Sequence, residues 1–443
     1  MFSKLALYRD QFLSWFDGLA GTTRSRVVLA IVVSIIHLGL FARAGHVRLD
    51  LPFNSAPGER PYYSDPDAPS VMGFPRQPHH WSRLIVSRWD SEHYVGFAVR
   101  GLSACPTDGK PGQVEDFKYL QCGLGWLPAY GSIGGLLSKI TTIPEDYSLV
   151  GLSVLCTILV NLLWTSAPFV KRLGKREALG TLIAFNAFPT AFYMTTPYTE
   201  AATLMLMLAG FVALANDRWV LSGFLVGAST ALRASAVAGS FGFGFASLVA
   251  AYKRRKSGDP KWWKALLGIP LCGWSMALQM LILKLVVGDS LAFLRARNAF
   301  GDDHNFLRIF DTEFYLKAFT SQHMDGVMLV GSFAIVALGI KEVVKKLGAA
   351  ESVYLIVSSI VSLALAIAAV HEYWGLNRYL LLCPITFCCA GVLLRKHPVA
   401  FILWCVLSAM IYWHVEMCSY ISHGNPQVCP CLGRFEFGMP FQS

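Results

Sequence analysis

The sequence contains few charged residues, which excludes an ordinary soluble protein. Only 15% of the 443 residues are charged, whereas 54% are hydrophobic, and the mean hydropathy is +0.47. Soluble domains contain about 25% charged residues, and disordered chains lack the apolar residues that dominate here. Apolar runs of about 17 to 25 residues, long enough to cross a bilayer, recur along the whole chain. We therefore predict one all-α polytopic membrane domain over residues 1–443.

Other missing features narrow the class further. Cys429 and Cys431 have no second Cys or His pair at zinc spacing, and no dense acidic or histidine cluster is present, so we expect no metal and no cofactor. The first apolar run does not end in a small-residue cleavage site, which favours a retained span. The formal charge of +10 comes from short basic clusters between apolar runs, a pattern that favours membrane orientation over nucleic-acid binding.

These basic clusters predict eleven transmembrane helices with the N-terminus in the cytoplasm. The segment Trp126–Ile140 is only 15 residues long and is not counted as a span. With it kept on one side, every basic cluster faces the cytoplasm, as the positive-inside rule requires. Residues 46–125, which we expect to carry interfacial helices, 288–326 and 416–443 then lie on the outer face. The expected spans are 26–45, 148–167, 177–196, 199–215, 219–232, 235–252, 263–286, 327–345, 352–370, 379–394 and 398–415.

The expected outer face collects both acidic side chains and arginines. This combination suits an anionic substrate that is embedded in lipid. Asp90 follows Trp89, an amphipathic residue that would hold the carboxylate at headgroup depth on a short interfacial helix. The candidate residues are Arg88, Asp90, Glu92, His93, Glu200, Arg233, Asp289, Arg295, Arg297, His371, Glu372, Asn377 and Arg378.

Several candidates have a structural alternative. Arg233, expected at a turn that splits the apolar stretch 219–252, could form a structural salt bridge with Glu200 instead of binding substrate. Glu92 could be a solvated neighbour of Asp90, and His93 a hydrogen-bonded interfacial histidine. The arginines of the second outer-face loop, Arg295 and Arg297, could simply reach lipid headgroups.

Five motifs in the same order resemble a known family of membrane enzymes. They occupy residues 88–94 (Arg-Trp-Asp-Ser-Glu-His-Tyr), 186–200, 231–235, 288–297 and 377–380 (Asn-Arg-Tyr-Leu). Together they resemble the PIG-V type of GPI mannosyltransferase and its bacterial relatives, which are GT-C glycosyltransferases. Two elements differ from the family pattern: residues 125–130 keep a single proline, and residues 234–236 read Ala-Ser-Ala. Both lie near the groove that the resemblance implies.

The resemblance implies transfer of one sugar, with mannose favoured, from a polyprenyl-phosphate donor to a hydroxyl of a lipid-linked or membrane-associated acceptor. In this reaction Asp90 would accept the hydroxyl proton, with Glu92 as the second choice, while the anomeric carbon inverts. Arg378 and Arg233 would stabilise the departing phosphate, and Arg88 would position Asp90 or the phosphate. The expected partners are the lipid-linked donor, a lipid or glycolipid acceptor and membrane lipids, without nucleic acid.

Two other classes of function stay open. A secondary transporter would also be polytopic and carry intramembrane charges, but its charges should lie at mid-membrane on broken helices of two related halves. A scaffold without catalysis would tolerate substitution of Asp90. The expected location is a bacterial inner membrane, with the endoplasmic reticulum membrane as the alternative, and an active site on the outer face.

Overall fold

The computed structural model of the chain describes residues 21–49, 90–102, 123–299, 305–320, 323–369 and 376–412, with isolated positions between 11 and 18. All regular secondary structure in these ranges is helical. The α-helices are α2 (Thr23–Leu49), α4 (Asp90–Arg100), α6 (Ala129–Thr141), α7 (Glu145–Trp164), α8 (Ala167–Leu173), α9 (Lys175–Asn186), α10 (Glu200–Ala215), α11 (Trp219–Ser229), α12 (Val237–Lys256), α13 (Trp274–Val286), α14 (Ala292–Ala299), α15 (Thr312–Thr320), α16 (His323–Lys346), α17 (Ala349–Ala369), α18 (Leu376–Leu380), α19 (Pro384–Lys396) and α20 (Pro398–Ile411). The short 3₁₀ helices are η1 (Ala191–Met194), η2 (Ala234–Ala236), η3 (Trp262–Leu266), η4 (Ile269–Leu271) and η5 (Phe306–Phe310).

Six helical segments in these ranges are long and apolar enough to cross a membrane. They are residues 23–42, 145–173, 234–256, 262–286, 326–346 and 349–369. Their outward faces carry large apolar side chains, such as Ile35 on α2 and Leu281 on α13, which are more than half exposed. Apolar surface of this extent requires lipid or a partner to cover it. The fold is therefore consistent with a multi-pass membrane protein.

The structure differs from the eleven expected spans where prolines interrupt the apolar runs. The helix expected over 177–196 ends at Asn186, three residues before Pro189, and the run expected over 379–394 breaks into α18 and α19 at Pro384. Proline lacks the N–H that a helix interior requires and disfavours helical geometry in the preceding residue. The helices α10, α11 and α20 are apolar but shorter than a full span. The number of eleven stays a prediction.

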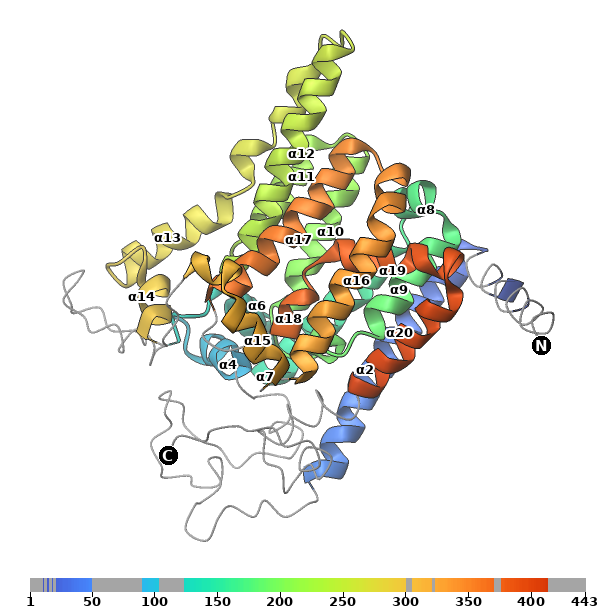
Figure 1. Cartoon of the computed structure of the whole chain (residues 1–443). Coiled ribbons are helices and arrows are strands. Elements are labelled where there is room, and N and C mark those ends of the chain that lie inside the picture. The colour runs from blue at the N-terminus through green and yellow to red at the C-terminus, as the bar shows by residue number, and fades with distance from the viewer. Residues whose placement is uncertain are drawn as a thin grey trace.

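The helices pack into one bundle around α9, α10, α17 and α19 (Figure 1). Glycines allow the closest approaches, because α9 and α19 meet where Gly180 faces Gly391 and an added Cβ on Gly391 would overlap the carbonyl oxygen of Glu177. Small residues at such contacts are typical of helix packing in membranes. Beside this core, α2 and α20 run next to each other along one edge, where His37 Nδ1 lies 3.3 Å from the hydroxyl of Tyr412.

The amphipathic helix α4, which begins with Asp90, lies directly on α6. Gly131 and Gly135 face α4, and a Cβ at either position would collide with the backbone carbonyl of Tyr94 or Ala98. As expected from the sequence, α6 is short, with 13 residues, and is not one of the membrane-length helices. This backbone-to-backbone contact fixes α4 against α6 and therefore the position of Asp90.

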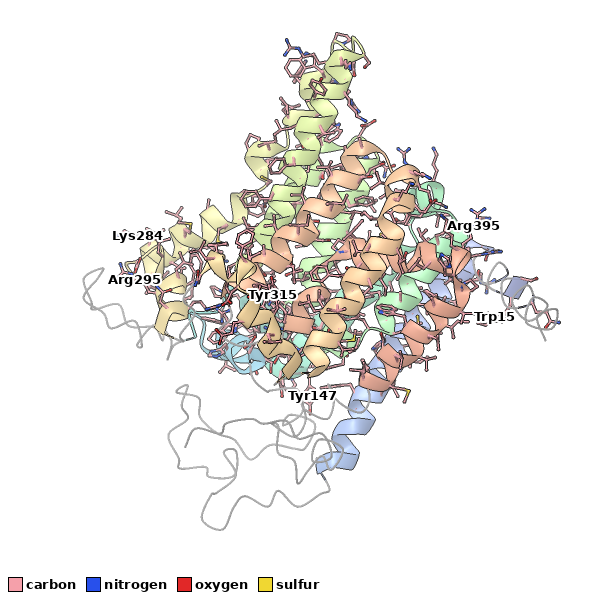
Figure 2. All side chains as sticks on the ribbon, in the orientation of Figure 1. Trp15, Tyr147, Lys284, Arg295, Tyr315 and Arg395 are labelled. Atoms are coloured by element: carbon pink, nitrogen blue, oxygen red, sulfur yellow. The ribbon has the colours of Figure 1, made fainter. Side chains whose placement is uncertain are left out.

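The bundle has two ends that α17 joins. Glu351 lies in the first turn of α17 and Ala369 is its last residue, so about 27 Å of helix separates them at 1.5 Å per residue. Tyr147, in the first turn of α7, lies at the same end of the bundle as α4, whereas Arg395, in the last turn of α19, lies near α8 (Figure 2). The two ends are called here the α4 end and the α8 end.

Candidate functional site

Four ionised side chains form an alternating chain at the α4 end. Asp90 Oδ2 pairs with Arg378 Nη2 at 2.7 Å, and Arg378 Nε lies 2.9 Å from Glu200 Oε1. The same oxygen of Glu200 pairs with Arg233 Nη1. The exposed fractions of the side chains are 25% for Asp90, 13% for Arg378, 0% for Glu200 and 11% for Arg233. Buried charges are costly unless each has a partner, and here each charge has one.

Local structure explains why these four residues meet. Glu200 is the first residue of α10, where the positive end of the helix dipole stabilises an acid, and Asp90 lies on α4. Arg233 lies between α11 and η2 in extended conformation, as the sequence predicted when the apolar stretch was split at this residue. Arg378 lies in α18, which is held to the segment after α9 by a hydrogen bond from the Thr190 hydroxyl to the carbonyl oxygen of Asn377 at 3.0 Å.

Tyrosine rings surround the two arginines of the chain. The guanidinium of Arg378 lies 5.1 to 5.6 Å from the ring centres of Tyr193, Tyr198 and Tyr379. Arg233 lies 4.3 Å from the centre of the same Tyr379 ring. A cation over an aromatic face is stabilised by about 0.5 to 2 kcal/mol, more where water is excluded. The rings therefore hold both guanidinium groups in place without neutralising them.

Asp90 is ionised more easily than an ordinary aspartate. Burial is the largest single influence and opposes ionisation, but the charges of Arg378 and Arg297 and the hydrogen bond from Arg378 outweigh it. Together they lower the pKa of Asp90 from 3.8 to about 2. A carboxylate held in this way stays charged at neutral pH and is a weak proton acceptor for as long as Arg378 remains its partner.

The ion pairs open onto a cavity of about 200 Å³. Its polar wall contains Asp90 and the three arginines Arg233, Arg297 and Arg378. Its apolar wall comes from α14, α17 and the end of the α11 connection, and includes Phe293, Leu294, Leu365 and Leu232. The three arginines exceed the two carboxylates Asp90 and Glu200 by one positive charge, so the cavity suits an anionic group that carries an apolar chain.

The structure brings only some of the candidate residues to this cavity. Asp90, Arg233, Arg297 and Arg378 line it, and Glu200 lies behind the two arginines as their shared partner. The salt bridge between Arg233 and Glu200, one of the two sequence interpretations, is therefore present. The side chains of Arg88, Glu92, His371 and Glu372 lie outside the described residues.

Other candidates have positions away from the cavity lining. Asp289 is paired with Arg295 at 2.9 Å and accepts a hydrogen bond from the Leu291 N–H. These contacts stabilise the segment 289–295 itself. The ring of His93 stacks on Trp126 with 3.4 Å between the ring centres. Asn377 is buried within α18. No group of three His, Cys, Asp or Glu that could hold a metal occurs within the described part of the chain.

Three aromatic residues of the site were missed from the sequence. Tyr379 and Tyr198 line the cavity against the arginines, and Trp126 lies between His93 and Arg297, whose guanidinium is 5.4 Å from its ring centre. The two tyrosines lie within the motifs 186–200 and 377–380. Their positions close to Glu200 and Arg378 in the sequence could have indicated that they belong to the site. The contacts of these three rings with arginine guanidinium groups could not be predicted, because they include residues distant in sequence.

Comparison with known proteins does not assign the chain to a family. The sequence matches no protein-family model, and no curated protein is significantly similar to it. The functional conclusion therefore depends on the geometry of the cavity and on the motif resemblance.

Proposed function

We propose that the protein is an integral-membrane glycosyltransferase that transfers a sugar, with mannose favoured, from a polyprenyl-phosphate donor to a hydroxyl of a lipid-linked acceptor. The proposal includes a GT-C-like arrangement and an active site at the α4 end of the bundle. The observation that carries it is the cavity in which Asp90 faces Arg233, Arg297 and Arg378 beside an apolar wall. A phosphate group linked to an isoprenoid chain has the matching chemistry.

The proposed reaction assigns one task to each charged residue of the cavity. The acceptor oxygen attacks the anomeric carbon of the donor and transfers its proton to Asp90. The bond between that carbon and the phosphate oxygen breaks, and the phosphate monoester leaves with the electron pair. Its increased negative charge is stabilised by Arg378, Arg233 and Arg297, whose side chains line the same cavity. Glu200 does not touch substrate and holds two of these arginines in position.

The decisive test is an assay of the purified protein with polyprenyl-phosphate mannose and a panel of lipid acceptors. We expect transfer of one sugar with release of the polyprenyl phosphate. The Asp90→Asn variant is the matched negative control, because it preserves size and cannot take up the proton. Failure of every tested polyprenyl-phosphate sugar to react, with protein that is folded by its thermal melt, would argue against a glycosyltransferase.

The proposed orientation places the α4 end outside and the α8 end in the cytoplasm. The cations of the α8 end include Lys171, Arg172 and Arg395, as the positive-inside rule demands of a cytoplasmic surface. Two exposed positions test this: Val99 on α4 and Lys171 on α8. An impermeant thiol reagent should label Val99→Cys in intact cells and Lys171→Cys only after permeabilisation, each measured against the unmodified protein. Labelling of both from one side would contradict the orientation.

A further inference from the structure

The carboxylate of Asp90 and the phosphate of the proposed donor require the same partner. Arg378 Nη2 lies 2.7 Å from Asp90 Oδ2, and its Nε lies 2.9 Å from Glu200 Oε1 in an ion pair without hydrogen-bond geometry. Both carboxylates therefore lie against the guanidinium edge that would bind a phosphate in bidentate fashion. The cavity has a volume of about 200 Å³ next to this edge. Asp90 and Arg378 both line this cavity, so a phosphate that binds Arg378 there competes with the carboxylate of Asp90.

The two carboxylates differ in how easily they can be displaced. Glu200 is completely buried and pairs with two arginines. Asp90 is 25% exposed, lines the cavity and, within the described part of the chain, has one ion pair, which is to Arg378. Displacing Glu200 would leave a buried charge without solvent, which is strongly unfavourable. Asp90 is therefore the acid that can give up its place on Arg378.

Asp90 has other stabilising groups when it leaves Arg378. His93 of α4 interacts electrostatically with Asp90 and favours its charged form. The guanidinium of Arg297, on α14, also interacts electrostatically with Asp90 across the cavity. The carboxylate can turn toward these groups without a change in the position of α4, which Gly131 and Gly135 fix against α6.

We propose that Asp90 occupies the phosphate position on Arg378 and is exchanged for the phosphate of the donor when the donor binds. This inference rests on the proposed function and adds a control step to it. While Asp90 is paired with Arg378, its carboxylate is a poor proton acceptor. Phosphate binding removes that cation from Asp90 and brings a new anion close to it, and both changes strengthen Asp90 as a base. The protein would thus activate its base only after the donor is in place.

The exchange has an unusual consequence for binding. A residue that only positions the donor should weaken donor binding when it is removed. A residue that competes with the donor should strengthen donor binding when its charge is removed, because the two anions are linked through one arginine. Coupling between two such sites is commonly worth about 5-fold to 150-fold in affinity. We therefore expect Asp90→Asn to bind the phosphate at least about 5-fold more tightly than the unmodified protein while losing sugar transfer.

The test measures binding of a short-chain polyprenyl monophosphate, and of the uncharged polyprenol of equal length, to the purified full chain in nanodiscs. Asp90→Asn should lower the Kd for the phosphate and leave the Kd for the alcohol unchanged. A double-mutant cycle with Arg378→Gln isolates the competition: in that background, Asp90→Asn should no longer change the Kd for the phosphate. If either substitution prevents folding, Asp90→Ser and Arg378→Met replace them in the same cycle, because methionine also removes the shared cation.

Each outcome has a distinct meaning. An unchanged or higher Kd in Asp90→Asn overturns the exchange and leaves the proposed function intact, provided the unmodified protein prefers the phosphate to the alcohol. Tighter binding that persists without Arg378 also overturns it, because the effect is then a general loss of negative charge. If the unmodified protein does not discriminate between phosphate and alcohol, the proposed function fails, and the exchange fails with it.

Discussion

The two ends of α17 carry two clusters of ion pairs that are built in different ways. At the α4 end, Asp90, Glu200, Arg233 and Arg378 are all between 0% and 25% exposed. At the α8 end, the acids are similarly protected but most cations are not: the Arg172 side chain, which pairs with Glu351 at 3.0 Å, is 45% exposed.

The same difference is seen at Glu177 of the α8 end. Its partners are Lys346 at 2.6 Å and Arg395 at 3.6 Å, and the side chain of Arg395 is 65% exposed. Water and salt reach these cations and weaken the pairs. Arg233 and Arg378 at the α4 end are less exposed to water and salt, because they contact tyrosine rings and line the cavity. Cations withdrawn from water and aimed at a cavity indicate a binding site, whereas solvated cations above buried acids indicate a membrane-surface anchor.

The largest difference between the two ends should appear in catalysis. Asp90→Asn is expected to reduce sugar transfer by about 10²-fold to 10⁴-fold, the usual range for loss of a general base. The matched control is Glu351→Gln, which removes an acid of the α8 end and should leave the rate of transfer unchanged. The measurement is the transfer rate at saturating donor. Equal losses in the two variants would remove the distinction between the ends.

The second largest effect is expected on the free energy of unfolding when Glu200, the acid shared by Arg233 and Arg378, is replaced. Glu200→Gln leaves Arg233 and Arg378 with one fewer anion in a buried site, and breaking a buried pair costs about 3 kcal/mol. Glu177→Gln is the matched change at the α8 end, where the exposed cations can be solvated, so a smaller loss is expected. Thermal unfolding in detergent compares the two. A larger loss in Glu177→Gln would contradict the interpretation of the α4 end as the desolvated cluster.

Substitution of Arg378 by lysine should have a moderate effect on donor use. Lysine keeps the charge but cannot offer two parallel donors to phosphate, so we expect KM for the donor to rise by about tenfold, a change worth one bidentate contact. Arg378→Ala should be more severe. Donor titrations measure both variants. An unchanged donor dependence in both would make Arg378 an interfacial anchor and move the phosphate contact to Arg233 or Arg297.

The smallest effect is expected at the solvated cluster. Arg172→Gln removes a cation whose side chain is 45% exposed, while the buried Glu351 keeps its hydrogen bond from the Gly348 N–H, so we expect a loss of about 1 kcal/mol. Transfer activity should be unchanged and the thermal midpoint nearly so. A loss of transfer in this variant would show that the two ends are coupled.

The sequence was sufficient to predict the helical membrane class and the turn at Arg233, and it gave the pair between Arg233 and Glu200 as one of two alternatives. These follow from composition and from the cost of an isolated charge among apolar residues, which are local properties. The breaks near Pro189 and Pro384 follow from the prolines, which outweigh the length of each apolar run. The pairing of Asp90 with Arg378, 288 positions apart, could not be predicted, because it depends on how α4 and α18 approach each other.

The roles of the aromatic residues were hidden for the same reason. Tyr379 follows Arg378 directly, yet its ring also lies beside Arg233, which comes from another part of the bundle. A tyrosine in an apolar run is commonly a packing residue, and only the tertiary structure shows which cations it faces. Similarly, the sequence placed Asp289 and Arg295 among the substrate-binding candidates, whereas the structure pairs them with each other away from the cavity lining.

The contact between α4 and α6 makes the proposed active site vulnerable to changes that carry no charge. Because Gly131 and Gly135 allow the backbones to touch, a single methyl group at either position would push α4, and with it Asp90, away from the bundle. A displacement of about 1 Å can reduce a reaction rate by about 10²-fold. Gly131→Ala is a conservative substitution in polarity and size. It would nevertheless change the position of the Asp90 carboxylate without changing its chemistry.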